Sequence, residues 1–256
     1  MADQNEIQRL GRHGTRLKEL RKRLKERREG EVVVDGRRLV SDLVRWNVPI
    51  RELYLAPEIS RDFEAVGWRD AAEVVFEVEG SVLSDIAPTR SPQGVLAVVV
   101  EPRGEESSAE DGIVLWVDRV QDPGNLGAIV RSAAGLGSAA VLLSPGCADP
   151  FGASAVRGSA GAVFRIPVER EVSAAAAVAR MKQAGGEIWA SDSLGWKIDR
   201  WRPSENCLLL IGAEGSGLDP EAVELADGTV AIPMSRGIES LNVAVATGIL
   251  LQHLRR

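Results

Sequence analysis

Short apolar runs alternate with amphipathic stretches along this chain of 256 residues, a pattern typical of α/β proteins. In the first hundred residues, four runs rich in valine and leucine predict strands. They cover residues 32–34, 52–55, 74–76 and 95–100. Between the first two, residues 37–46 place Leu39, Val40, Leu43 and Val44 on one side of a predicted helix. A small α/β unit is therefore expected at the start of the chain.

A change in composition divides the chain in two. Residues 101–112 lack apolar periodicity and are rich in Glu, Ser and Gly, which is the composition of a linker. We therefore place an N-terminal unit at residues 1–104, a linker at 105–112 and a C-terminal unit at 113–256.

The C-terminal unit begins with a near-continuous apolar run at residues 113–117, as expected of a strand buried on both faces of a parallel sheet. An amphipathic stretch with Leu126, Ile129 and Val130 on one face predicts a helix after it. Further strands are expected at 139–143, 163–167, 187–190, 207–212 and 229–232, and a helix at 174–184. This alternation predicts an α/β fold with a mostly parallel sheet covered by helices on both sides.

Composition excludes several classes of protein. At 45% hydrophobic and 27% charged residues the chain resembles an ordinary globular protein. No apolar run approaches the length of a membrane span and no leader pattern is seen, so we expect a cytoplasmic protein without a membrane partner. Two cysteines, Cys147 and Cys207, are too few for a disulfide framework or a zinc site. With only two histidines, His13 and His253, neither a histidine triad nor a metal centre is expected.

The net charge of −6 hides an uneven distribution. Between Arg9 and Arg28 there are ten Lys or Arg and two acids, a local balance of +8, which leaves −14 for the rest of the chain. Such a basic segment favours contact with phosphates, because local patches rather than net charge make these contacts. The alternative is the solvated face of a helix whose other side carries Leu10, Leu17 and Leu20.

Three polar loops in the C-terminal unit each follow a predicted strand. The first, residues 118–127, leads into the helix that bears Arg131, and Asn125 is positioned to cap that helix. The second, residues 210–218, has three glycines within six residues around Glu214, more than a plain turn needs. In an open α/β sheet, polar loops at strand ends are a common place for a ligand.

The third loop, residues 232–244, has two interpretations. Ile232 and Met234 end a strand around a proline, and Ser240 and Asn242 precede an apolar helix that runs almost to the last residue. The segment is either an ordinary junction with an N-cap at Ser240 or one wall of a ligand site. Common nucleotide-binding loops are excluded, since neither G-x-x-x-x-G-K-[ST] nor G-x-G-x-x-G is present.

Together the three loops resemble the SpoU (TrmH-type) family of RNA ribose 2′-O-methyltransferases, in the SPOUT superfamily. The matching segments are Asn125-x-Gly127 with Arg131, residues 157–162, residues 211–218, Ile232-Pro233-Met234 and Ser240-Leu241-Asn242-Val243. The N-terminal unit resembles, more loosely, the ribosomal-protein-like (L30e-type) substrate-binding domain of such enzymes. Its supporting segments are residues 33–40 and 92–98.

The resemblance implies a C-terminal trefoil knot, S-adenosylmethionine bound in its loops, and a homodimer formed by the C-terminal domain. The dimer has support of its own, because the last helix is apolar around most of its circumference. Carried over by position, the residues that contact the methyl donor are Gly212, Ile232, Met234 and Leu241. Those that correspond to catalytic and substrate-positioning residues are Asn125, Arg131, Glu214, Ser240 and Asn242.

The role of Arg131 has two versions. The family proposal makes this arginine the group that activates the ribose hydroxyl. Because arginine is effectively always protonated, Arg131 can instead bind the target phosphate and stabilise the developing alkoxide. The chain departs from the usual family pattern at Arg236, where glycine is frequent, and at Ala244, where serine is frequent. The resemblance therefore does not assign the residues of the third loop that face the acceptor RNA.

Three functions compete at this point. The first is methylation of a ribose 2′-hydroxyl in structured RNA, with ribosomal RNA favoured over transfer RNA because of the ribosomal-protein-like N-terminal unit. The second is an RNA-binding relative that has lost catalysis. The third is a small-molecule enzyme of doubly wound fold, which the separate basic unit disfavours. The methylated nucleotide is not identified by the sequence.

Overall fold

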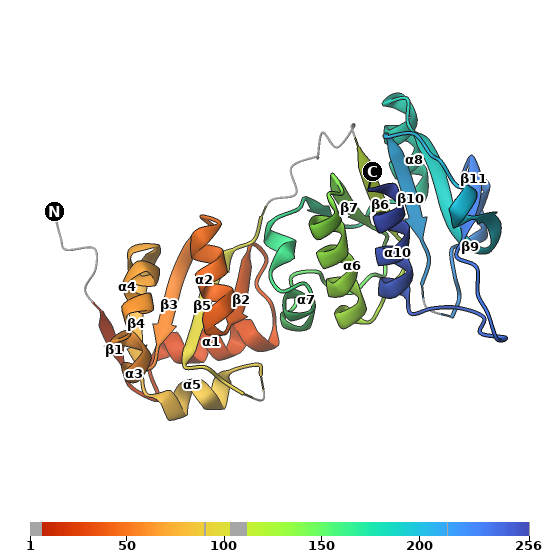
Figure 1. Ribbon diagram of the computed structural model, residues 1–256. Helices are drawn as coiled ribbons and strands as arrows, with labels where there is room; N and C mark the ends of the chain where they lie inside the picture. Colours follow the sequence, from red (N-terminus) through yellow and green to blue (C-terminus); the bar gives the residue numbers. More distant parts are fainter. Residues whose placement is uncertain (1–6, 90, 103–111, 214, 256) are drawn as a thin grey trace. The chain divides into compact units, whose positions relative to one another are not determined.

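The computed structural model (Figure 1) describes residues 7–89, 91–102, 112–213 and 215–255. Its contacts divide the chain into two compact units, Met1–Arg103 and Gly104–Arg256. The predicted linker at 105–112 lies outside the described residues except for Gly112. Each unit is built around a sheet of its own.

The N-terminal unit contains a five-stranded mixed sheet in the order β1-β4-β3-β5-β2. β5 runs antiparallel to β2 and β3, while β1, β4 and β3 are parallel. The strands are β1 (Gln8–Leu10), β2 (Glu31–Asp35), β3 (Ile50–Leu55), β4 (Ala72–Val78) and β5 (Val95–Val100). The helices are α1 (Thr15–Lys25), α2 (Arg37–Arg45), α3 (Pro57–Ser60), α4 (Phe63–Asp70) and α5 (Gly80–Ile86). The four strands and the helix predicted for this unit are confirmed.

The basic segment is not one continuous helix. Residues 8–10 form β1, which pairs with β4, and the helix begins only at Thr15. Gly11 and Gly14 lie between them in a turn closed by a hydrogen bond from Gly14 N to Gly11 O of 2.9 Å. Glycines weaken a helix because their unfolded backbone is so free, which explains why helical spacing of leucines did not extend the helix to Leu10.

The apolar side of α1 packs on the sheet. Leu17 and Leu20 are fully buried in a core that includes Tyr54 and Phe76, whose rings stack with centroids 5.0 Å apart. The Tyr54 hydroxyl donates to Glu52 Oε2 at 2.6 Å. Burial, together with the neighbouring Glu52 carboxylate, raises the pKa of Tyr54 well above its ordinary value, so the hydroxyl keeps its proton and remains a donor.

The C-terminal unit contains a six-stranded sheet in which every pair is parallel, in the order β11-β9-β10-β6-β7-β8. The strands are β6 (Ile113–Val117), β7 (Ala140–Leu143), β8 (Val168–Glu169), β9 (Glu187–Lys197), β10 (Cys207–Ile211) and β11 (Gly228–Ala231). The helices are α6 (Pro123–Leu136), α7 (Ala153–Gly158), α8 (Ala174–Gln183), α9 (Pro220–Glu224) and α10 (Val243–Leu254), with 3-10 turns η1 (Ala162–Phe164) and η2 (Ile198–Arg200). The predicted parallel α/β fold is confirmed.

One predicted strand of this unit is wrong. Residues 163–167 were expected to be extended, but Ala162–Phe164 form a 3-10 turn and only Val168–Glu169 pair with β7. Gly161 precedes the turn in the left-handed conformation, with φ at 80°, and Pro167 has no amide hydrogen to contribute to a ladder. The edge strand therefore starts after the proline.

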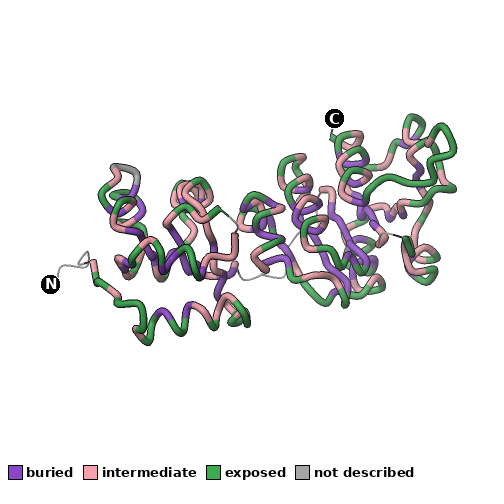
Figure 2. Tube along the Cα trace, turned by 90° about the horizontal axis from the view of Figure 1, so that it is seen from below, coloured by how far each residue is buried: buried purple, intermediate pink, exposed green. Residues whose placement is uncertain are grey.

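Helices cover both faces of this sheet. On one face α8 buries Ala177, Val178 and Met181 against inward side chains of β6 and β10, including Trp116 and Leu210. On the other face α6 packs against α7 and α10. Figure 2 shows that the buried positions follow the strands and the inner faces of these helices. No helix among the described residues is long and apolar enough to cross a membrane.

Candidate active site

The three polar loops lie at the same edge of the C-terminal sheet. They follow β6, β10 and β11, and all strands of this sheet are parallel, so the carboxyl ends of these strands point the same way. The crevice outside the carboxyl ends of strands is where ligands bind in open α/β sheets. Each loop contributes differently to this edge.

The first loop enters α6 through Asp122, not Asn125. The Asp122 carboxylate accepts a hydrogen bond from Asn125 N at 2.7 Å and caps the helix, and Pro123 occupies its first position. The predicted cap at Asn125 is therefore wrong, which leaves the Asn125 side chain for another partner. Arg131 lies exposed further along α6, and it makes no ion pair with any described residue.

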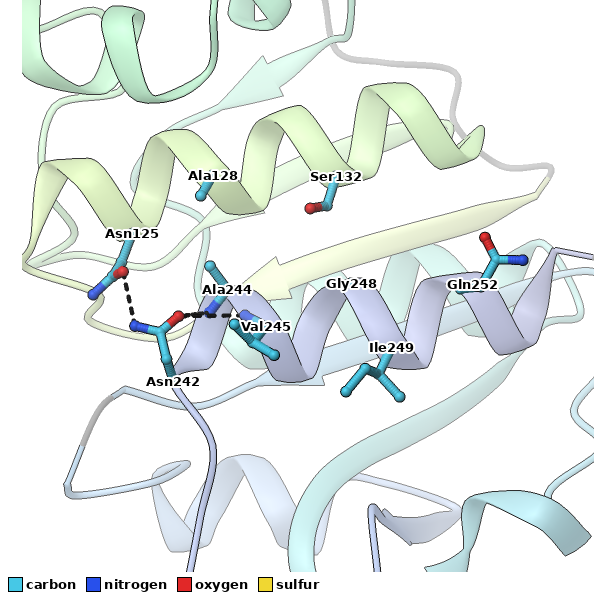
Figure 3. A pocket seen from close by; sticks show the side chains of 9 residues that line it. All are labelled: Asn125, Ala128, Ser132, Asn242, Ala244, Val245, Gly248, Ile249 and Gln252. Carbon is cyan, nitrogen blue, oxygen red and sulfur yellow. Dashed lines mark hydrogen bonds between the residues drawn. The ribbon is translucent and has the colours of Figure 1, made fainter.

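The third loop enters α10 through Asn242, so the predicted cap at Ser240 is also wrong. Asn242 Oδ1 accepts from Ala244 N at 3.0 Å and Val245 N at 3.3 Å, whereas Ser240 lies exposed two residues before it. Asn242 Nδ2 donates to Asn125 Oδ1 at 2.9 Å, as Figure 3 shows. A primary amide suits this position because it has an acceptor for the cap and donors for a second helix.

The glycine-rich loop after β10 closes on itself. A Cβ added to Gly212 would lie 2.3 Å from both Gly217 C and Leu218 N, so no larger residue fits there without moving the backbone. Ala213 and Gly217 exchange two backbone hydrogen bonds of 3.1 and 3.0 Å. Gly215 and Gly217 have φ of 84° and 68°, the left-handed region that favours glycine. Glu214, predicted in this loop, lies outside the described residues.

Apolar side chains line the course of the third loop. Ile232 and Met234 are half-buried directly after β11, while Leu241 is 36% exposed and Ile238 57% exposed. A loop that ends a strand and leaves such side chains partly uncovered offers an apolar surface next to backbone groups. Arg236, at the tip, has φ of 58°.

A groove between α6 and α10 was missed by the sequence analysis. It has a volume of about 590 Å³ and is lined by both helices (Figure 3). Small residues allow the helices to approach: a Cβ on Gly248 would lie 3.7 Å from Ser132 Oγ. The signal was present, because Ala128 and Ser132 on one helix and Ala244 and Gly248 on the other are each spaced by four residues.

Comparison with known proteins agrees with this architecture. The model of the SpoU rRNA Methylase family matches residues 112–252, and that of the MRM3-like substrate binding domain matches residues 15–97. The 23S rRNA (guanosine(2553)-2′-O)-methyltransferase RlmP of Bacillus subtilis is 33% identical over 226 residues, which are 87% of this chain and 88% of RlmP. An uncharacterized tRNA/rRNA methyltransferase of Synechocystis is 36% identical over 71% of this chain and 67% of its own length.

Solved structures give the same result. The AdoMet-bound rRNA methyltransferase of Sinorhizobium meliloti superposes with a TM-score of 0.83 at 28% identity, covering 97% of both chains. The SpoU methyltransferase AviRb of Streptomyces viridochromogenes, in complex with the cofactor AdoMet, gives 0.82 at 28% identity, covering 94% of this chain and 97% of AviRb. With both units matched and more than half of the residues covered by one family model, the chain belongs to the SpoU rRNA Methylase family.

Proposed function

We propose that the protein transfers a methyl group from S-adenosylmethionine to a ribose 2′-hydroxyl of ribosomal RNA. The observation that carries the proposal is the hydrogen bond between Asn242 and Asn125, which joins the starts of α10 and α6 at the edge where the glycine-rich loop lies. Family membership adds that relatives of this architecture bind the same cofactor.

The donor side of this edge suits S-adenosylmethionine, which supplies an activated methyl group on a sulfonium. Gly212 leaves no room for a side chain, because its backbone packs directly on that of Gly217 and Leu218, and this tight loop brings backbone amide and carbonyl groups to the edge. Ile232, Met234 and Leu241 offer partly uncovered apolar surface for the adenine ring. Mostly apolar walls with a few fixed polar groups are typical of cofactor sites.

On the acceptor side, Arg131 holds a phosphate of the target nucleotide and stabilises negative charge that develops on the ribose oxygen. A permanently charged guanidinium does not remove the hydroxyl proton itself, so a phosphate oxygen or water takes it. Asn125, Ser240, Asn242 and Glu214 orient the reacting groups, because holding atoms in line at about 3–3.5 Å supplies much of the acceleration.

The N-terminal unit supplies RNA affinity through one face of α1. Arg16, Arg23 and Arg27 are paired with carboxylates of the same unit. Lys18, Arg21, Lys22 and Lys25 instead form no ion pair with a described residue, and their spacing places them on one side of the helix. Four cations on one side of the helix without an ion pair to a described residue are available for RNA phosphates, whereas the neutralised arginines are not.

We further propose a trefoil knot in the C-terminal unit and a homodimer formed through α10. Val245 is 52% and Ile249 38% exposed, and both line the groove that this helix shares with α6. A terminal helix that leaves such side chains uncovered gains stability from a second copy. We also propose a cytoplasmic location.

Methyl transfer is tested with labelled S-adenosylmethionine and RNA from cells with and without the gene. We expect transfer to ribosomal RNA from the deletion strain only, and loss of one 2′-O-methyl position in that strain when such positions are mapped. Methyl transfer to transfer RNA alone would show that transfer RNA, and not ribosomal RNA, is the substrate. If calorimetry detects no binding of S-adenosylmethionine near millimolar concentration, the protein would instead be an RNA-binding relative without catalysis.

The α1 face is tested separately with a variant in which Lys18, Arg21, Lys22 and Lys25 are changed to glutamine. We expect weaker RNA binding at every salt concentration and a salt dependence shallower by roughly three units of slope. S-adenosylmethionine affinity should not change. An unchanged salt slope would contradict phosphate contact by this helix.

A further inference from the structure

A buried carboxylate lies directly behind the candidate site. Asp118 follows β6, and its side chain is only 5% exposed. Carboxylates are rarely buried to this extent unless hydrogen bonds and a countercharge compensate the lost hydration. The sequence analysis gave this group no role.

Three donors surround the Asp118 carboxylate. Ser144 Oγ donates to Oδ1 at 3.1 Å. Asp219 N and Arg119 Nη2 donate to Oδ2 at 3.1 and 2.8 Å. The guanidinium of Arg119 also lies 3.6 Å from Asp219 Oδ2, so it bridges the two aspartates. The negative charge of Asp118 is thus compensated within a closed set of contacts.

Each donor belongs to a different loop at the carboxyl edge of the sheet. Arg119 is in the loop after β6, Ser144 directly follows β7, and Asp219 ends the glycine-rich loop that begins at Gly212 after β10. Ser144 Oγ in turn accepts from Arg119 N at 2.9 Å. Arg119 has φ of 49°, so this contact supports a backbone conformation that non-glycine residues seldom adopt.

The network fixes the far end of the glycine-rich loop. Its near end is fixed by β10, where Asp118 N donates to Ile211 O at 2.8 Å, and its middle by the Ala213–Gly217 pair. The contact from Asp219 N to Asp118 holds the remaining end, and Asp219 goes on to cap α9 through Glu221 N. Between this loop and residues 119–122 lies a polar pocket of about 300 Å³.

We propose that Asp118 is a positioning residue for the methyl donor: its buried carboxylate holds the loop between Gly212 and Asp219 in the shape that binds S-adenosylmethionine. The inference rests on the proposed function. A neutral amide in place of the carboxylate loses the pairing with Arg119 and presents N–H groups to donors, which frees the end of the loop. Donor affinity falls, while chemistry at saturating donor changes little.

The experiment measures S-adenosylmethionine binding by calorimetry, and KM and kcat for RNA methylation, with the full chain. We expect Asp118→Asn to raise both the dissociation constant and the KM for the donor about 10-fold or more, with kcat at saturating donor within about threefold of the parent. Ser144→Ala, which removes one of the three donors, should show the same split at about threefold to 10-fold.

Asp227→Asn is the control for loss of a backbone hydrogen bond elsewhere on the sheet. Asp227 also accepts a backbone hydrogen bond across two elements, from Ile188 N at 2.9 Å, but at the amino edge of the same sheet. It should leave the donor dissociation constant unchanged. Donor affinity within twofold of the parent for a folded Asp118→Asn variant would overturn the inference. So would unfolding of both Asp118→Asn and Ser144→Ala, since it would assign the network to the stability of the whole unit. If the parent chain itself binds no donor, the proposed function fails instead.

Discussion

Polar side chains serve different purposes in α1 and at the carboxyl edge of the C-terminal sheet. On α1 and just after its end the partners are mostly other side chains: Arg23 pairs with Glu31 and Glu52, and Arg27, two residues beyond the helix, pairs with Glu101. At the sheet edge the side-chain oxygens of Asp122 and Asn242 accept from backbone amides, and Asp118 accepts from one backbone amide besides its two side-chain donors. Side-chain pairs attach a helix to a sheet, whereas contacts to amides determine the shape of a loop. Changes to the ion-paired side chains of the first region should alter stability, and changes in the second should alter donor binding and turnover.

The largest effect is expected for Gly127→Ala in α6, which tests the close packing of α6 against α7. A Cβ there would lie 2.4 Å from Ala155 O and 2.8 Å from Ser159 N, so α6 and α7 must move apart. We expect the free energy of unfolding of the C-terminal unit to fall by about 3 kcal/mol. Chemical denaturation followed by tryptophan fluorescence measures it.

The matched control lies on the same helix. A Cβ on Gly135 meets nothing within 4 Å, so Gly135→Ala should stabilise the unit by about 0.5–1 kcal/mol through the better helix propensity of alanine. Equal effects of the two substitutions would refute the packing argument.

Turnover is tested by Arg131→Lys. A point charge does not reproduce the planar fork that grips a phosphate, so kcat should fall about 100-fold, equivalent to about 2.7 kcal/mol of transition-state stabilisation. The donor dissociation constant should stay that of the parent, which calorimetry checks. Near-normal turnover would remove Arg131 from the site.

The stability role of α1 is tested by comparing Arg23→Ala with Lys18→Ala. The Arg23 side chain is 12% exposed and its Nη1 lies 2.8 Å from Glu52 Oε2, so its loss leaves two carboxylates without that partner. We expect about 2 kcal/mol less stability for Arg23→Ala and no measurable change for exposed Lys18→Ala. Methylation at saturating RNA should be equal in both. A loss of donor affinity in Arg23→Ala would contradict the assignment of this ion pair to stability alone.

The smallest effect is expected for Asn242→Ala. It removes the cap of α10 and the bond to Asn125, at a cost of about 1 kcal/mol in stability. Asn242→Ser restores an acceptor for the cap but is too short to reach Asn125. Asn242→Ser should therefore restore the stability that Asn242→Ala loses, but not the turnover that depends on the contact with Asn125. Full recovery of both would limit Asn242 to its capping role.

The sequence predicted the strands of both sheets well because apolar runs such as residues 113–117 are buried whatever their neighbours are. It failed where a tertiary contact decides. Ser240 is a good cap former, but Asn242 takes the cap because its amide also reaches Asn125. Residues 163–167 are apolar except for Arg165, yet Pro167 has no amide hydrogen to donate to a ladder.

The candidate site was recognised through its motifs, not through its supporting contacts. Gly212 is marked by the density of glycines around it, and the structure supplies the reason in the approach of Gly217. Asp118 carries no such mark, since a single carboxylate after a strand looks like any solvated loop residue. Only the meeting of Arg119, Ser144 and Asp219 around it reveals the network.

The position of β10 has a consequence for how the enzyme acquires its site. This strand lies between β9 and β6, and its pairing with β6 joins segments that are far apart in the chain. Contacts of long sequence separation form slowly, because the intervening chain loses entropy before they are made. The glycine-rich loop follows this strand, so we expect it to take shape only once β10 has paired with β6 and β9. During refolding, the ability to bind S-adenosylmethionine should accordingly appear later than helical structure. A nascent chain should likewise stay inactive until its last strands emerge.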